Sequence, residues 1–162
     1  MKIFLLALLI IFSFNSFGFS SERIGGWGAF HFGMKQSQID VLLSMECEIS
    51  ARDKHTEVFS EGRNCGVFLD EKYDLSIHTS KEWWEFNRRT IIIKLLFNNN
   101  ETTYKKIINY YSNKWEKVDY YCSKVLNSCT TKFGQSSDIV VNQPSYPKSK
   151  IEVMFIDRAY FN

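Results

Sequence analysis

The order of the periodic segments constrains this fold more than any other feature of the sequence. A first helical pattern begins at Ser37, with Asp40 in capping-box position, and ends near residues 45–47. Its apolar stripe is Ile39, Leu42 and Leu43. A second helical pattern follows Asn100, which can cap it, and its apolar stripe is Tyr104, Ile107, Ile108, Tyr111 and Trp115. Each helix is followed by several strand patterns.

The strand patterns differ in how they alternate. Strict alternation over residues 73–79 predicts a half-exposed antiparallel strand with Tyr73, Leu75, Ile77 and Thr79 on one face. Residues 90–97 are apolar and β-branched on both faces, which favours a central strand. A short strand is expected at Phe30–Phe32 after a flexible glycine-rich lead-in, and a turn at 61–64. Further strands are expected at 57–59, 65–69, 117–122, 129–133, 138–142 and 150–156.

We therefore expect an α+β fold: an antiparallel β-sheet with two helices packed on it. The repeated order of elements fits a tandem of two helix-plus-strands units, with halves at 27–97 and 98–162. It fits equally an α+β chain that happens to have two helices, because no side-chain motif repeats between the halves.

The N-terminal segment has the order of a secretory signal peptide. Lys2 precedes an apolar run from Ile3 to Phe12, and small residues follow at Gly18 and Ser20. A membrane span needs about 20 apolar residues, and this run is shorter. We expect residues 1–20 to be removed, which leaves 21–162 as a single domain without a transmembrane segment. We expect this domain to be located in the periplasm or outside the cell.

All four cysteines lie in the predicted exported part of the chain. An even count in an exported protein indicates disulfides. Three pairings are open, and we favour Cys47–Cys65 and Cys122–Cys129 because partners close in sequence are simplest. No spacing typical of a zinc site is present, and we expect neither a metal nor a cofactor.

Residues Phe30-x-Phe32-Gly33-Met34, followed by Ile39-Asp40-x-Leu42-Leu43, resemble the opening of many small exported bacterial α+β proteins. The pattern is similar to the helix-then-antiparallel-sheet unit of the outer-membrane-assembly small lipoproteins. It is also similar to that of the β-lactamase-inhibitor proteins, which pair two such units. The resemblance implies a non-enzymatic, protein-binding module. The chain lacks the lipidated cysteine of the assembly lipoproteins, so their role is not carried over.

Known catalytic motifs are missing from the sequence. It contains no Gly-x-Ser-x-Gly, and the glycines at 25–33 match neither the dinucleotide pattern nor the P-loop. His31, His55 and His78 are the three histidines, and the carboxylates are scattered. The formal net charge of +2 gives no argument for a nucleic-acid partner.

One segment has the residue types of a protein-binding site. Residues 81–89 contain two adjacent tryptophans, a phenylalanine and two arginines, which are enriched in interface hot spots. We expect the binding residues to be Trp83, Trp84, Phe86 and Arg88, although the rings could also pack on the sheet. The leading hypothesis is an exported protein-binding module of the inhibitor, immunity or envelope-accessory kind. A hydrolase acting on envelope or extracellular material and a structural envelope component are the alternatives.

Overall fold

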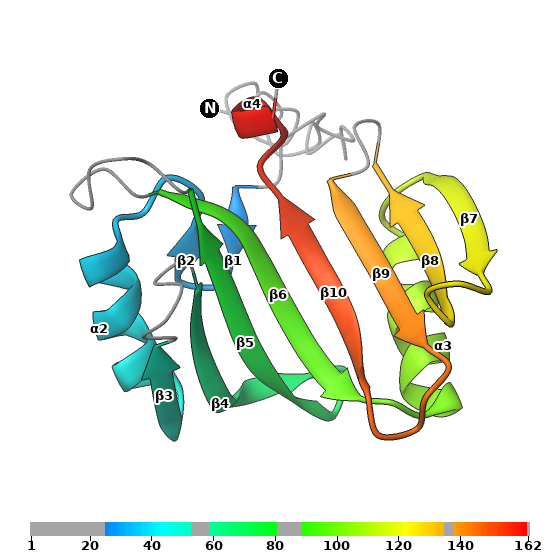
Figure 1. Ribbon diagram of the computed structural model, residues 1–162, viewed down its shortest axis with the longest axis horizontal. Helices are drawn as coiled ribbons and strands as arrows, with labels where there is room; N and C mark the ends of the chain where they lie inside the picture. Colours follow the sequence, from blue (N-terminus) through cyan, green and yellow to red (C-terminus); the bar gives the residue numbers. More distant parts are fainter. Residues whose placement is uncertain (1–24, 53–58, 81–88, 135–137, 162) are drawn as a thin grey trace, which may run out of the picture.

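The helices and strands are arranged as an antiparallel sheet with two helices on one of its faces, so the predicted α+β fold is confirmed (Figure 1). The computed structural model describes residues 25–52, 59–80, 89–134 and 138–161. The predicted signal peptide lies outside these residues and stays a prediction.

The main sheet has eight strands in the order β3-β4-β5-β6-β10-β9-β8-β7, and every neighbouring pair is antiparallel. The place of β6 near the middle agrees with its apolar sequence. The strands are β3 (Ile49–Arg52), β4 (Phe59–Phe68), β5 (Glu71–Thr79), β6 (Thr90–Asn98), β7 (Lys117–Ser123), β8 (Ser128–Phe133), β9 (Ile139–Pro144) and β10 (Lys150–Ile156). A short helix, α4 (Arg158–Phe161), follows β10.

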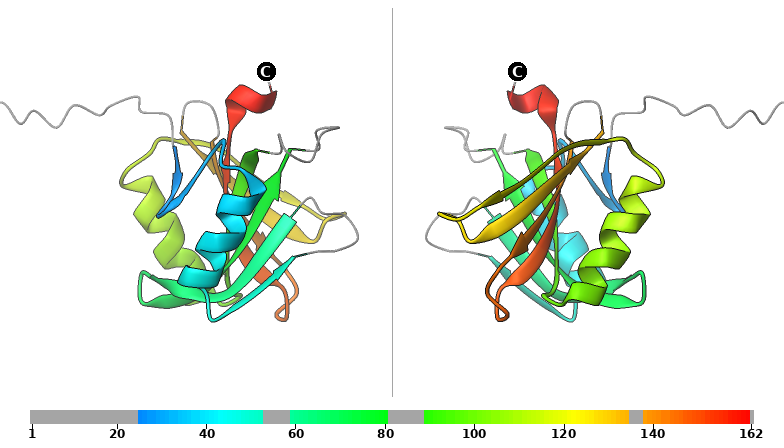
Figure 2. Two further views of the ribbon diagram at one scale, coloured as in Figure 1. Left: turned by 90° about the vertical axis from the view of Figure 1, so that its left-hand side faces the viewer. Right: turned by 90° about the vertical axis from the view of Figure 1, so that its right-hand side faces the viewer.

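The sheet is built from two units with the same order of elements. In the first unit, helix α2 (Gln36–Glu46) precedes the meander β3 to β6, and in the second, α3 (Glu101–Ser112) precedes the meander β7 to β10. Each meander runs from an outer edge to the middle, where β6 pairs with β10. Both helices lie on the same side of the sheet (Figure 2). This order of elements fits the tandem of helix-plus-strands units, which is one of the two interpretations that the sequence left open.

The two helices begin differently. Asn100 caps α3 as predicted, because its side chain accepts a hydrogen bond from the Thr103 N–H at 2.7 Å. The predicted Ser37 cap of α2 is wrong, since the helix already begins at Gln36 and its N-cap is Lys35. Here the Gln38 side chain accepts from the Lys35 N–H at 2.9 Å. The backbone N–H of the cap is thus satisfied, but the Lys35 side chain has no oxygen that could accept a hydrogen bond from the helix.

The core lies between the helices and the sheet. Ile39 and Leu43 of α2 and Ile107 and Tyr111 of α3 are almost completely buried there. The strand residues that face them alternate with residues of the opposite face, as expected for a sheet covered on one side. They include Leu75, Ile77, Ile93, Leu95, Phe97, Phe133, Ile139, Val141, Ile151, Val153 and Phe155.

The glycine-rich lead-in is structured rather than flexible. Strands β1 (Gly26–Trp27) and β2 (Phe30–His31) form a small hairpin that lies between the two helices (Figure 1). The Trp27 ring stacks on Phe155 at 5.3 Å and contacts Phe68 edge-on at 4.9 Å. Packing of one large ring on the core therefore orders a segment whose composition favours mobility.

The predicted turn at 61–64 is wrong, because these residues continue β4. A register shift between Gly62 and Gly66 forms a bulge, in which Asn64 takes a positive φ of 50°. Gly62 lies directly under the disulfide, where a Cβ atom would collide with the Cys47 sulfur. Asn64 thus provides the positive φ of the bulge, and Gly62 provides the space that the disulfide needs. The chain turns instead at Leu69 and Asp70, which both have positive φ, so Leu69 is not part of the strand.

The structure has two disulfides, in the favoured pairing, one in each unit. Cys47, at the C-cap of α2, is joined to Cys65 of β4, and both are buried. Cys122 and Cys129 are directly paired residues of β7 and β8, near the outer edge of the sheet. The first bond ties a helix to the sheet, and the second closes a hairpin. Both fit a protein that works outside the cytoplasm.

Candidate functional site

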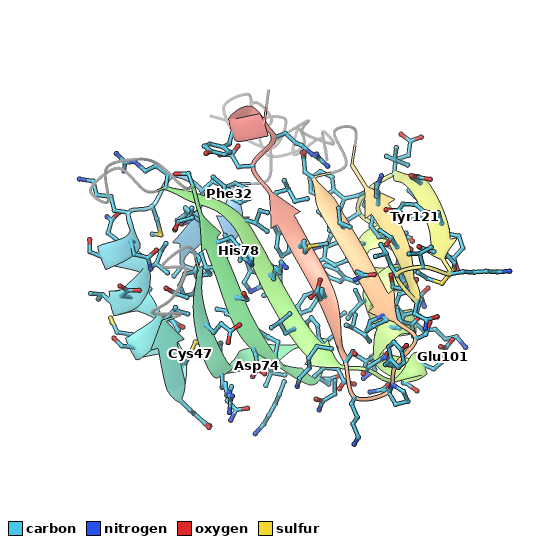
Figure 3. The ribbon with its side chains drawn as sticks, in the orientation of Figure 1. Phe32, Cys47, Asp74, His78, Glu101 and Tyr121 are labelled. Atoms are coloured by element: carbon cyan, nitrogen blue, oxygen red, sulfur yellow. A yellow bond between two sulfur atoms is a disulfide. The ribbon has the colours of Figure 1, made fainter. Side chains whose placement is uncertain are left out.

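The face of the sheet opposite the helices is covered by no helix of the described residues. We call it the open face; it is turned toward the viewer in Figure 3, where Asp74 and His78 mark its β5 portion. Its residues are those that alternate with the core positions, so the pleat of each strand decides its composition.

A row of directly paired residues crosses the middle of the open face. Ser76 of β5 pairs with Lys94 of β6, which pairs with Met154 of β10. Met154 pairs in turn with Val140 of β9, which pairs with Lys132 of β8. Five strands from both units therefore contribute to one continuous surface.

Apolar side chains surround Lys94 on this surface. Ile92 and Leu96 precede and follow it on the same face of β6, and Met154 and Ile156 lie beside it on β10. All four are half-buried in a face that no described helix covers. A half-exposed apolar group of this size on an otherwise charged surface is the composition expected at the centre of a protein contact.

The charges around this apolar group are mostly paired. Asp74 lies 3.7 Å from Lys150 and accepts the Asn64 N–H, and Asp119 lies 3.3 Å from Lys132. Lys94 differs: no carboxylate among the described residues, Glu152 of the neighbouring strand included, forms an ion pair with it. Among the described residues, a half-buried ammonium with apolar neighbours thus has no carboxylate partner on the open face.

His78 lies on the same face, where it pairs with Ile92. Burial lowers the pKa of His78 to about 4, and the positive charge of Lys94 adds to this effect. The imidazole is therefore neutral at physiological pH, so that among the described residues around His78 the positive charge is that of Lys94.

The hairpin of β7 and β8 is the second unusual surface. Every β7 residue from Lys117 to Cys122 is exposed, including Tyr120 and Tyr121. Tyr121 pairs with Thr130 on the open face, whereas Tyr120 points to the other side. At the turn, Val125 and Leu126 are 94% and 72% exposed. The disulfide ties the exposed strand β7 to β8, most of whose residues are buried.

The predicted binding residues Trp83, Trp84, Phe86 and Arg88 lie outside the described residues, so that hypothesis stays a prediction. The residues that bracket the segment are close to each other. The Ser80 N–H donates to the Arg89 carbonyl at 2.8 Å, and the Arg89 N–H donates to the Ser80 hydroxyl at 3.0 Å. The two described residues that flank the segment are therefore neighbours, at the end of β5 and the start of β6.

A hydrolase would be favoured by a deep pocket that holds a histidine near a carboxylate. A hollow of about 320 Å³ lies at the start of α3, and its lining includes Asn99, Glu101 and Gln143. Neither His31 nor His78 belongs to this lining. Among the described residues, no three His, Cys, Asp or Glu side chains are grouped so as to hold a metal ion. In the same residues, no helix has the length and apolar character needed to cross a membrane.

Sequence reasoning missed the open face as a site. The alternation of 73–79 indicates a two-faced strand, but it does not tell which face the helices cover. Lys94 was not singled out, because it is one charged residue inside an apolar run. The signal that could have found it is this charge at a position predicted to be a central strand. Comparisons with protein-family models, with curated proteins and with solved structures gave no match.

Proposed function

We propose that this chain is an exported protein-binding module, of the inhibitor, immunity or envelope-accessory kind, whose contact surface is the open face of the sheet. The predicted signal peptide and the two disulfides support a place in the periplasm or outside the cell. The resemblance carried by Phe30–Leu43 also implies a protein-binding role.

The observation that carries the proposal is the position of Lys94. It lies on the central strand β6 within the row that crosses the open face, and Ile92, Leu96 and Met154 surround it. Apolar neighbours exclude water when a partner covers them, and a charge pair formed there is stronger than one at a rim. We therefore expect the partner to insert a carboxylate between apolar side chains of its own.

The segment with Trp83 and Trp84 adds a second expected contact. It connects β5 to β6 in the chain, and these are the two strands that carry His78 and Lys94. The hypothesis that its rings bind the partner is thus compatible with a contact surface on the open face.

Capture from the envelope fraction of the source organism tests the proposal, with the exported chain as bait. The variant Lys94→Glu reverses the charge in the middle of the open face, and Trp83→Ala/Trp84→Ala removes the two rings. Lys105→Glu is the matched control: Lys105 lies on α3 and has a 70% exposed side chain that pairs with Glu101. Thermal melts of all variants establish that they fold.

We expect a partner that wild type and Lys105→Glu retain and that Lys94→Glu loses. Titration of the identified partner should show a loss of affinity of at least about 30-fold, as for other buried hot-spot charges. A partner that binds Lys94→Glu as well as it binds wild type would show that the open face is not the contact surface. Loss with Trp83→Ala/Trp84→Ala alone would move the contact to the segment between β5 and β6.

A further inference from the structure

We propose that the tip of the β7–β8 hairpin binds an anionic lipid surface. The apolar tip consists of Val125 and Leu126, which are 94% and 72% exposed. They occupy the turn between Ser123 and Ser128, beyond the directly paired Cys122 and Cys129. The disulfide keeps the hairpin closed, so the two aliphatic side chains are presented by an ordered turn rather than by a loose loop.

A third apolar side chain is held beside the tip by the neighbouring loop. The Ser145 N–H donates to the Asn127 carbonyl at 2.7 Å, and the Asn127 amide donates to the Tyr146 hydroxyl at 3.0 Å. Tyr146 is 60% exposed. A tyrosine whose ring is in water and whose hydroxyl is hydrogen-bonded has the character of the rings found at membrane–water interfaces.

The charge of the two loops has a single sign. Lys124 and Lys148 flank the apolar residues, and residues 120–130 and 139–151 contain no aspartate or glutamate. Further up the hairpin, Lys117 lies over the Tyr120 ring and Lys132 over the Tyr121 ring. Asp119, the nearest carboxylate on β7, is paired with Lys132. Glu101, which lines a hollow beside Ser145 and Pro147, is paired with Lys105. The charges of Lys124 and Lys148 are therefore complementary to an anionic surface.

The shape of the tip favours lipid over protein. Val125 and Leu126 project from a turn, so a protein partner would need a cavity that matches them, whereas a lipid layer adapts to any small apolar projection. The order of residues along the hairpin also fits a lipid surface. Aliphatic side chains are at the tip, and tyrosines and lysines follow at the level of the head groups.

Vesicle flotation tests this proposal, with the disulfide-bonded exported chain and vesicles of phosphatidylcholine with and without phosphatidylglycerol. Val125→Ser/Leu126→Ser removes the apolar tip, and Lys124→Gln/Lys148→Gln removes the charges. Val41→Ser/Met45→Ser is the matched control, because these α2 side chains are 57% and 73% exposed and belong to the other unit. Since all these side chains are exposed, the variants should fold as wild type does.

Wild type and the α2 variant should bind vesicles that contain phosphatidylglycerol, and added salt should weaken this binding. The tip variant should lose about tenfold in partition coefficient, and each lysine replaced should cost about fivefold. Equal vesicle binding by the tip variant and wild type would overturn the proposal. Failure of wild type to bind vesicles that contain phosphatidylglycerol would also overturn it. If the tip variant instead loses a captured protein while wild type binds no vesicles, the tip is a protein contact. Because none of the substituted residues is in the row that contains Lys94, failure here leaves the open-face proposal standing.

Discussion

The first unit uses its disulfide to hold α2 against β4, whereas the second unit uses its disulfide within the hairpin at the outer edge of the sheet. The helices explain this difference. Helix α2 buries Ile39 and Leu43 but has no side-chain cap. Helix α3 has the Asn100 cap and adds the buried ring of Tyr111. A helix that packs and caps well needs no covalent tie, which leaves the second disulfide for an exposed element.

The two helices also differ in their aromatic contacts. Tyr111 of α3 lies 5.8 Å from the Phe133 ring and 6.4 Å from the Phe155 ring. Burial also raises the pKa of its hydroxyl, as expected for a side chain with almost no contact with water. Helix α2 has no aromatic residue, and its polar Gln36 is buried instead, with hydrogen bonds to Ser60 and Asp40. In addition to its buried aliphatic side chains, the first helix thus has specific polar contacts and a disulfide, whereas the second has a buried aromatic ring.

The largest effect should come from removing the disulfide that ties α2 to the sheet. Cys47→Ala/Cys65→Ala opens a loop with a sequence separation of 18 residues, which should lower the free energy of unfolding by about 3 kcal/mol. Chemical denaturation of the variant and wild type measures this difference. A loss below that of the second disulfide would contradict the view that α2 depends on its covalent tie.

Removing the second disulfide should cost less. Cys122→Ala/Cys129→Ala opens a loop with a separation of 7 residues, for an expected loss of about 2 kcal/mol. Because β7 contributes little to the core, we expect faster amide hydrogen exchange in β7 and β8 and little change in α3. Faster exchange throughout α3 would show that this disulfide also secures the helix.

The two helix caps should differ by about 1 kcal/mol. Asn100→Ala removes the hydrogen bond to the Thr103 N–H and should cost about 1 kcal/mol of stability. Lys35→Ala, the equivalent change in α2, should have almost no effect, because the Lys35 side chain forms no capping hydrogen bond. Lys35→Asp should instead stabilise α2 by adding a capping oxygen and a negative charge at the helix start. Thermal melts of the three variants compare the two helices.

The smallest effect concerns pH and the open face. Because the pKa of His78 is lowered from 6.5 to about 4, the unfolded chain binds a proton at a higher pH than the folded chain does. The contribution of the neutral His78 to the free energy of unfolding is therefore fully present above pH 6.5. It is lost as the pH drops from 6.5 to about 4. His78 is partly exposed, so we expect roughly 1 kcal/mol or less. His78→Gln should flatten the pH dependence of the free energy of unfolding in this range. If this pH dependence is unchanged in the variant, it arises from other titratable groups.

Local patterns predicted most of the second unit. The strands expected at 117–122, 129–133, 138–142 and 150–156 agree with β7 to β10 to within two residues at each end, and Asn100 caps α3 as expected. The first unit was predicted less well. Gly62 and Asn64 have the chemistry of a turn, but the disulfide and the bulge determine their conformation. The strand β3 was also missed, because its short sequence lacks a clear alternation.

By itself, the sequence determined the elements, their order and the cysteine content, because apolar periodicity and caps are local properties of the chain. The tertiary structure alone decided which face of the sheet the helices cover and how the two units meet. Pairing of β6 with β10 brings Lys94 beside Met154, although these residues are far apart in sequence. The open face exists only through this pairing, because residues from distant strands form a surface only once the sheet has set their register.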